Sequence, residues 1–253
     1  MIKLFRAVRQ RLLSENKFSK YMIYATGEIV LVVVGILIAL SINNQNENNK
    51  NRVLEKDYLE RMSLNIKADI KNIKASINNI KSRKKRSEFL LKCIEDPTLI
   101  EQRPSYFITS IEFSGYTNSP VITKNTFEEI KSSGKLSLIR NKKIKSKIGS
   151  YYAEGLSYQQ YGFIYEDMQR AFLKNRMGIL NSQQQIEMSS FSNDKNYSIT
   201  EAKAVYKRMK LKTDYIQLIP IIIHGQIRKT KNLQSHLKRA IHLDSIIQIE
   251  LNS

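Results

Sequence analysis

Residues that could catalyse a reaction or bind a metal are few in this 253-residue chain. The three histidines, His224, His236 and His242, do not fall on one helical face at the spacing of metal ligands, and no H-E-x-x-H motif occurs. The single cysteine, Cys93, excludes an intramolecular disulfide and a cysteine-based zinc site. Cys93 also has no histidine near it and lies in an apolar helical pattern, which argues against a catalytic thiol. We therefore predict no metal and no cofactor.

Paired carboxylates are the other candidates for chemistry. Glu128-Glu129 and Glu166-Asp167 are adjacent pairs, and adjacent residues on a helix point about 100° apart, so neither pair forms an acid–base dyad by itself. The phosphate-binding G-x-x-x-x-G-K, the dinucleotide-binding G-x-G-x-x-G and the nucleophile motif G-x-S-x-G do not occur. The sequence therefore predicts that the protein is not an enzyme.

The charge of the chain allows a different kind of function. Lys+Arg number 42 and Asp+Glu 23, which gives a net charge of +19 and an attraction to phosphate or anionic lipid. The basic run at residues 82–86 is most simply a solvated stretch of helix, with phosphate binding as the alternative. Lys, Asn, Ile and Tyr are abundant together, as AT-rich coding produces without selection for a basic surface. This disfavours nucleic acid as the partner.

Residues 21–42, YMIYATGEIVLVVVGILIALSI, are the most apolar part of the chain. As a helix they would be about 33 Å long, enough to cross a hydrocarbon core of about 30 Å. Glu28 lies in the first third, near the expected headgroup level, and Tyr21 suits the interface. We predict a transmembrane helix. The alternatives are a buried core helix and a signal peptide cleaved after Ser41, which would leave the chain without its anchor.

Charges on the two sides of this segment predict its orientation. Residues 1–20 hold six Lys/Arg and one acidic residue, with apolar residues at helical spacing, as in a basic amphipathic helix on an anionic leaflet. Residues 43–62 hold four Lys/Arg. The excess on the N-terminal side favours a single-pass protein of the inner membrane, with a cytoplasmic N-terminus and a periplasmic C-terminal domain.

One face of the predicted membrane helix could mediate association. Gly35 and Ala39 form a small-x-x-x-small pair, which lets two membrane helices approach closely. Glu28 and Ile42 fall on the same face as these two residues. We therefore predict Glu28, Gly35 and Ala39 as a membrane-helix association face and a homodimer as its product.

The rest of the chain reads as helices. Residues 43–51 are Asn-rich and form either a linker or a poor first helical turn, and residues 52–253 form a helical soluble domain. A coiled-coil-like seam of apolar residues follows, and Asp96-Pro97 ends it. The seam consists of Leu59, Met62, Ile66, Ile70, Ile73, Ile77 and Ile80.

Further boundaries follow from caps and breakers. Thr126 and Glu129 have capping-box spacing for a short helix that ends at Gly134, and Asn141 is the N-cap of a helix over 142–177. Residues 178–199 are predicted as a loop, after which Thr200 caps the next helix. A last helix covers 213–251.

Two positions inside the last helix, Pro220 and Gly225, are expected to kink or interrupt it. Only 9 Gly and 4 Pro in the chain favour long helices over a β-rich fold. The predicted fold class is therefore all-α: an N-terminal transmembrane helix followed by an elongated helical bundle.

Two stretches resemble a known family. YMIYATGEIVLVVVGILIALSINNQNE and NTFEEIKSSGKLSLIRNKKIKSKIGSYY are similar to a domain-of-unknown-function family of single-pass membrane proteins found mainly in Bacteroidota. Its members have a basic N-terminus, a G-E-I-V-L-V-x-x-G-I-L-I-A-L anchor and a helical soluble region, whereas this chain has Gln45 where the family usually carries Trp. The resemblance implies location and architecture, and it implies no reaction.

Two readings of the second stretch remain open. Phe127, Ile130 and residues 136–139 would lock a corner of the bundle, with Gly134 as a left-handed cap. Alternatively, a pocket would form around a set of polar residues. That set is Glu128, Glu129, Ser132, Ser133 and Arg140.

The sequence leaves two classes of function. The first is an extracytoplasmic interaction or sensory module, anchored in the lipid bilayer and binding an unknown protein partner. The second is a binder of anionic polymer or nucleic acid through basic helices.

Overall fold

The computed structural model describes residues 18–116, 119–190 and 196–252. The chain divides into two compact units, Met1–Asp57 and Tyr58–Ser253. Helices account for 86% of the structure, and no strand occurs in the described residues. The all-α fold class is therefore confirmed, with a long N-terminal apolar helix followed by further helices. Most of the predicted amphipathic segment 1–20 lies outside the described residues.

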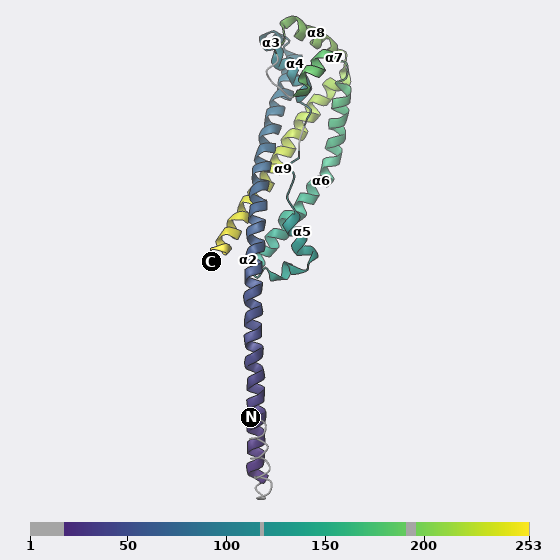
Figure 1. Ribbon diagram of the computed structural model, residues 1–253. Coiled ribbons are helices and arrows are strands. Elements are labelled where there is room, and N and C mark those ends of the chain that lie inside the picture. The colour runs from purple at the N-terminus through teal and green to yellow at the C-terminus, as the bar shows by residue number, and fades with distance from the viewer. Residues whose placement is uncertain (1–17, 117–118, 191–195, 253) are drawn as a thin grey trace. The chain divides into compact units, whose positions relative to one another are not determined.

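The first unit is dominated by helix α2 (Phe18–Glu95), which continues into the second unit (Figure 1). One helix is long and apolar enough to cross a membrane by length and composition, and none of its apolar window is buried. The large apolar side chains between Ile29 and Ile42 are all exposed. This segment is therefore not a core helix of the chain, which removes one alternative for residues 21–42.

The Asn-rich stretch 43–51 is helical and lies inside α2. Asparagine is a poor helix former, but no Gly or Pro occurs between Gly35 and Pro97 to end the helix. Pro97 follows the end of α2 closely, as the sequence indicated.

Three long helical stretches form the second unit: the part of α2 from Tyr58, α6 (Lys142–Asn175) and α9 (Thr213–Leu251). Helices α6 and α9 pack side by side (Figure 1). Buried hydrogen bonds join α2 to both, since Tyr151 of α6 donates to Asp69 and Ser87 of α2 bonds to Gln226 of α9.

The predicted seam is the buried face of α2. Six of its seven residues are buried, with exposed fractions of 6% or less, and Ile70 is half-buried. Asp69 takes the buried place next to Ile70 and is 0% exposed. Asp69 and Ile70 each lie three or four residues from Ile66 and from Ile73, so the 3,4 spacing of the seam fits either of them. The seam was predicted correctly apart from this one position.

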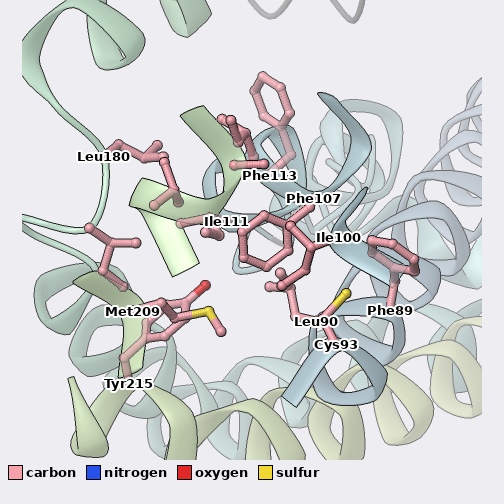
Figure 2. Close-up of a cluster of buried hydrophobic side chains, with 14 of the residues drawn as sticks. Phe89, Leu90, Cys93, Ile100, Phe107, Ile111, Phe113, Leu180, Met209 and Tyr215 are labelled. Atoms are coloured by element: carbon pink, nitrogen blue, oxygen red, sulfur yellow. The ribbon is translucent and has the colours of Figure 1, made fainter. Parts of the chain in front are cut away.

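Short helices gather at one end of the second unit (Figure 1). They are α3 (Thr98–Gln102), α4 (Pro104–Phe113), α7 (Ser182–Glu187) with the 3-10 turn η2 (Met188–Ser190), and α8 (Ile199–Lys210). Helix α8 packs on α3, α4 and α9. Figure 2 shows the apolar core that these elements share with α2, in which Cys93 lies among Phe89, Leu90 and Ile100.

The corner formed by α5 (Asn125–Ser132) and the 3-10 turn η1 (Lys135–Leu138) follows the prediction in part. Gly134 is left-handed, with φ of 69°, and Ile130 and Ile139 are buried. The expected capping box at Thr126 is wrong. The helix begins at Asn125, so Thr126 lies inside its first turn and is not the N-cap. The buried Thr126 hydroxyl accepts a hydrogen bond from Asn65 of α2 instead.

Two further boundaries differ from the prediction. The loop expected at 178–199 contains α7, because Asn181 and Gln184 form a reciprocal capping box that starts a helix in a polar stretch. Helix α8 is capped by Ser198, not Thr200, and Ser198 forms the same motif with Glu201. Asn141 caps α6 as predicted.

Helix α9 runs through Pro220 and Gly225 without interruption, so the interruption offered as one outcome at these positions does not occur. A Cβ at Gly225 would overlap the ring of Tyr165 from α6. The Tyr165 hydroxyl donates to the carbonyl of Ile222 at 3.1 Å, one turn before Gly225. The glycine therefore serves the close packing of α6 against α9.

Candidate functional site

The predicted association face lies on α2 in the first unit. Because the helix is continuous, Glu28, Gly35 and Ala39 fall within about 40° of one another around its axis. Gly35 and Ala39 are exposed, and a Cβ at Gly35 would meet no atom within 4 Å. The chain therefore leaves this part of the face open, and association through it stays a prediction.

A surface of arginine and tyrosine side chains lies where α2 meets the start of α4. Pro104 occupies the first turn of α4, which places Arg103 at its N-cap and Tyr106 one turn later. The guanidinium of Arg103 lies 4.3 Å from the centre of the Tyr106 ring, and that of Arg86 from α2 lies 4.8 Å from the same ring. One tyrosine thus contacts two cations.

A second tyrosine ring, that of Tyr116, is also contacted by two arginines. The guanidiniums of Arg83 and Arg176 lie 5.5 and 5.6 Å from the centre of the Tyr116 ring. Arg176 also pairs with Glu112 at 3.0 Å, and Tyr116 donates to the same carboxylate at 3.1 Å. This half of the site therefore contains its own carboxylate. The two rings and the charged side chains around them form what we call the arginine–aromatic surface: Arg83, Arg86, Arg103, Tyr106, Glu112, Tyr116 and Arg176.

Charge is poorly compensated at Arg83 and Arg103. Burial lowers the pKa of Arg83 and of Arg86 from the ordinary arginine value, and the neighbouring cations Arg86 and Arg103 act in the same direction. A guanidinium nevertheless stays charged in proteins. Within the described residues, Arg83 and Arg103 have no carboxylate partner. The predicted solvated run at 82–86 is therefore wrong for its two arginines, which pack on aromatic rings.

A second group of polar side chains is enclosed between α2, α6 and α9. Asp69 accepts hydrogen bonds from the Tyr151 hydroxyl at 2.8 Å and from the backbone N–H of Thr123 at 2.9 Å. The imidazole of His236 stacks on the Tyr151 ring, with 4.7 Å between centroids. Asp69, Tyr151 and His236 are all 2% exposed or less. We call these three residues the buried polar cluster.

The electrostatics of the buried polar cluster suit a structural role. Burial, followed by the charge of Asp69, raises the pKa of Tyr151, so its hydroxyl remains a hydrogen-bond donor at every physiological pH. Burial also lowers the pKa of His236, an effect that Asp69 opposes only in part. A substrate could not reach these groups without opening the bundle. The cluster therefore joins three helices and offers no accessible acid–base pair.

The other residues considered for catalysis or metal binding, Cys93, His224 and His242, do not come together in one site. Cys93 is fully buried, and burial raises the pKa of its thiol to about 12, so it is not a nucleophile at neutral pH. His224 and His242 are exposed on α9, away from the buried His236. No group of three or more His, Cys, Asp or Glu could hold a metal among the described residues.

The polar residues predicted to form an alternative pocket around α5 lie on the surface and do not enclose a pocket. Glu128, Glu129, Ser132, Ser133 and Arg140 are exposed. Glu129 pairs with Arg61 of α2 through both carboxylate oxygens, and this contact lowers the pKa of Glu129. The corner therefore ties α5 to α2, which agrees with the packing interpretation of this stretch.

Comparison with known proteins gives a family and no activity. A family model described as a family of unknown function, DUF6090, matches residues 28–226, and the chain therefore belongs to that family. No curated protein and no solved structure matches the chain.

Proposed function

We propose that this member of the DUF6090 family is a membrane-anchored interaction module, whose helical second unit binds a partner protein. The observation that carries the proposal is the apolar part of α2, whose large side chains are exposed from Ile29 to Ile42. Exposing such a surface to water is unfavourable, and a lipid bilayer is the environment that matches its length and composition.

The arginine–aromatic surface supports the interaction role. Arginine and tyrosine are enriched in the parts of protein interfaces that contribute most to affinity. Tyr106 and Tyr116 are half-buried and Arg103 is exposed, so the surface is reachable from solvent. The buried Cys93 and the enclosed polar cluster contribute no accessible reactive group. An interaction module fits these features better than an enzyme does.

The proposed location follows from the charge asymmetry. Six Lys/Arg in residues 1–20 against four in residues 43–62 favour a cytoplasmic N-terminus. The protein would then be a single-pass protein of the inner membrane, with the second unit in the periplasm. A homodimer formed through Glu28, Gly35 and Ala39 is compatible with this arrangement.

The test is membrane fractionation combined with a topology reporter. The intact chain is expected in the membrane fraction after a carbonate wash, and a variant without residues 1–42 is expected in the soluble fraction. Alkaline phosphatase fused after residue 253 is expected to be active, and a fluorescent protein that folds only in the cytoplasm is expected to stay dark.

Three outcomes would overturn the proposal or its location. A soluble intact chain would refute the anchor, and cleavage after Ser41 would replace the anchor with a signal peptide. A fluorescent C-terminal fusion would place the second unit in the cytoplasm. In that case the net charge of +19 would favour binding to nucleic acid or another anionic polymer.

A further inference from the structure

The two halves of the arginine–aromatic surface differ in one respect. On the Tyr116 ring, Arg176 has the carboxylate of Glu112 at 3.0 Å. On the Tyr106 ring, Arg103 has no carboxylate within the described residues, and its contacts are the faces of Tyr106 and Phe89. The first half shows how a carboxylate fits this type of site. The second half has the same cation and ring without that carboxylate.

Of the three arginines, Arg103 has the edge best suited to a planar anion, because Arg83 and Arg86 are engaged in hydrogen bonds within the chain. Arg83 donates to the carbonyl of Phe113 at 3.4 Å, and Arg86 donates to the Thr109 hydroxyl at 2.9 Å. Each guanidinium carries five N–H groups around its edge, and ring stacking uses the face, not the edge. The two ring contacts hold the guanidinium of Arg103 in place, and a carboxylate could bind to it in the bidentate geometry.

We propose that the arginine–aromatic surface binds a carboxylate-bearing segment of an acidic protein partner, with Arg103 as the central contact. This inference rests on the proposed interaction role and names the chemistry of its partner. An acidic side chain would offset the repulsion between Arg83, Arg86 and Arg103, and the tyrosine rings would pack against its neighbours.

A protein segment fits this surface better than a polyphosphate chain does. Polyanions bind through many exposed cations along a track, and their affinity comes mainly from released counterions. Here the cations are few and partly covered by aromatic rings.

The experiment uses the full chain in non-ionic detergent micelles and a fluorescein-labelled hexaglutamate peptide, with binding followed by fluorescence anisotropy. Arg103→Gln is expected to weaken binding by roughly tenfold or more, the value of one charged hydrogen-bonding contact. Arg103→Lys keeps the charge but lacks the fork, and it is expected to lose most of the same affinity. Lys67→Gln removes an exposed cation elsewhere on α2 and is the matched control, expected to stay within about twofold of the parent chain.

Circular dichroism melting of each variant checks that the fold is retained, and hexathymidylate serves as a phosphate competitor. The inference is overturned if Lys67→Gln weakens binding as much as Arg103→Gln, since charge alone would then explain it. If Arg103→Lys binds hexaglutamate as tightly as the parent chain does, the claim that the bidentate guanidinium geometry of Arg103 matters is overturned. Tighter binding of hexathymidylate than of hexaglutamate would replace the acidic protein with a polyanion. Binding in micelles does not depend on membrane orientation, so a failed topology test and a failed binding test are distinguishable.

Discussion

Replacing Asp69 tests whether the buried polar cluster stabilises the second unit. Asp69→Leu leaves the Tyr151 hydroxyl and the Thr123 N–H without their shared acceptor in the interior of the bundle. Each unsatisfied buried donor costs about 1–3 kcal/mol, so the free energy of unfolding should fall by roughly 2–6 kcal/mol. Asp69→Asn has nearly the same volume and retains one acceptor oxygen, so its loss should be smaller, about 1–3 kcal/mol.

The measurement is urea unfolding of the full chain in detergent micelles, followed by far-ultraviolet circular dichroism. Tyr151→Phe serves as the partner change, because it removes one donor and keeps the ring that stacks on His236. If unpaired donors cause the loss, the double variant Asp69→Leu with Tyr151→Phe should lose less than the sum of the two single losses.

The reasoning would be refuted by either of two results. Asp69→Leu could unfold at the parental urea concentration, which would mean that the cost of burying the carboxylate cancels the value of its hydrogen bonds. Asp69→Asn could lose as much as Asp69→Leu, which would mean that the number of acceptors is irrelevant.

Three further changes have defined outcomes. Because the folded-state pKa of His236 is lowered, its contribution to stability is present above pH about 6.5 and is lost as pH falls further. The melting temperature of the His236→Phe variant should therefore decline less below that pH than the melting temperature of the parent chain. The His242→Gln variant, which changes an exposed histidine, should decline as the parent chain does. Gly225→Ala should destabilise by about 1–3 kcal/mol in urea unfolding, because its methyl overlaps a tyrosine ring of α6; unchanged stability would mean that the ring moves aside freely. Gly35→Ile with Ala39→Ile should reduce crosslinked dimer in native membranes, and equal crosslinking would leave α2 as an anchor only.

Much of the fold could be predicted because local patterns determine it. The apolar seam from Leu59 to Ile80 is the buried face of α2, since a 3,4 spacing can bury one stripe only on a helix. The approximate ends of the last helix were predicted from its periodicity, although the interruption expected at Pro220 and Gly225 does not occur, and Asn141 was recognised as the N-cap of α6. The N-caps expected at Thr126 and Thr200 each lie two residues after the observed ones, Lys124 and Ser198. Ser198 can cap a helix as well as Thr200 can, whereas Lys124 makes no side-chain cap hydrogen bond, so no local cap signal marks the start of α5.

The candidate site could not be predicted in the same way, because its contacts join distant segments. Asp69 and Ile70 fit the seam equally well, and the donors that favour the carboxylate come from distant positions, the Thr123 N–H and the Tyr151 hydroxyl. Arg86 and Arg103 meet on Tyr106 because the chain reverses at Pro97 and restarts at Pro104. The one local signal was Arg103-Pro104 with Tyr106 a turn later, which puts a cation and a ring side by side.

The basic run at 82–86 shows how side-chain chemistry divides residues that carry the same charge. Arg83 and Arg86 are three residues apart and share the face of α2 that meets α4, where planar guanidiniums stack on aromatic rings. Lys84 pairs with Glu88 on its own helix at 2.6 Å, and Lys85 is exposed. An ammonium group is more strongly hydrated and has no flat face to stack, so it stays at the solvent side. Arginine at positions 83 and 86 therefore allows a packing against aromatic rings that lysine would not reproduce.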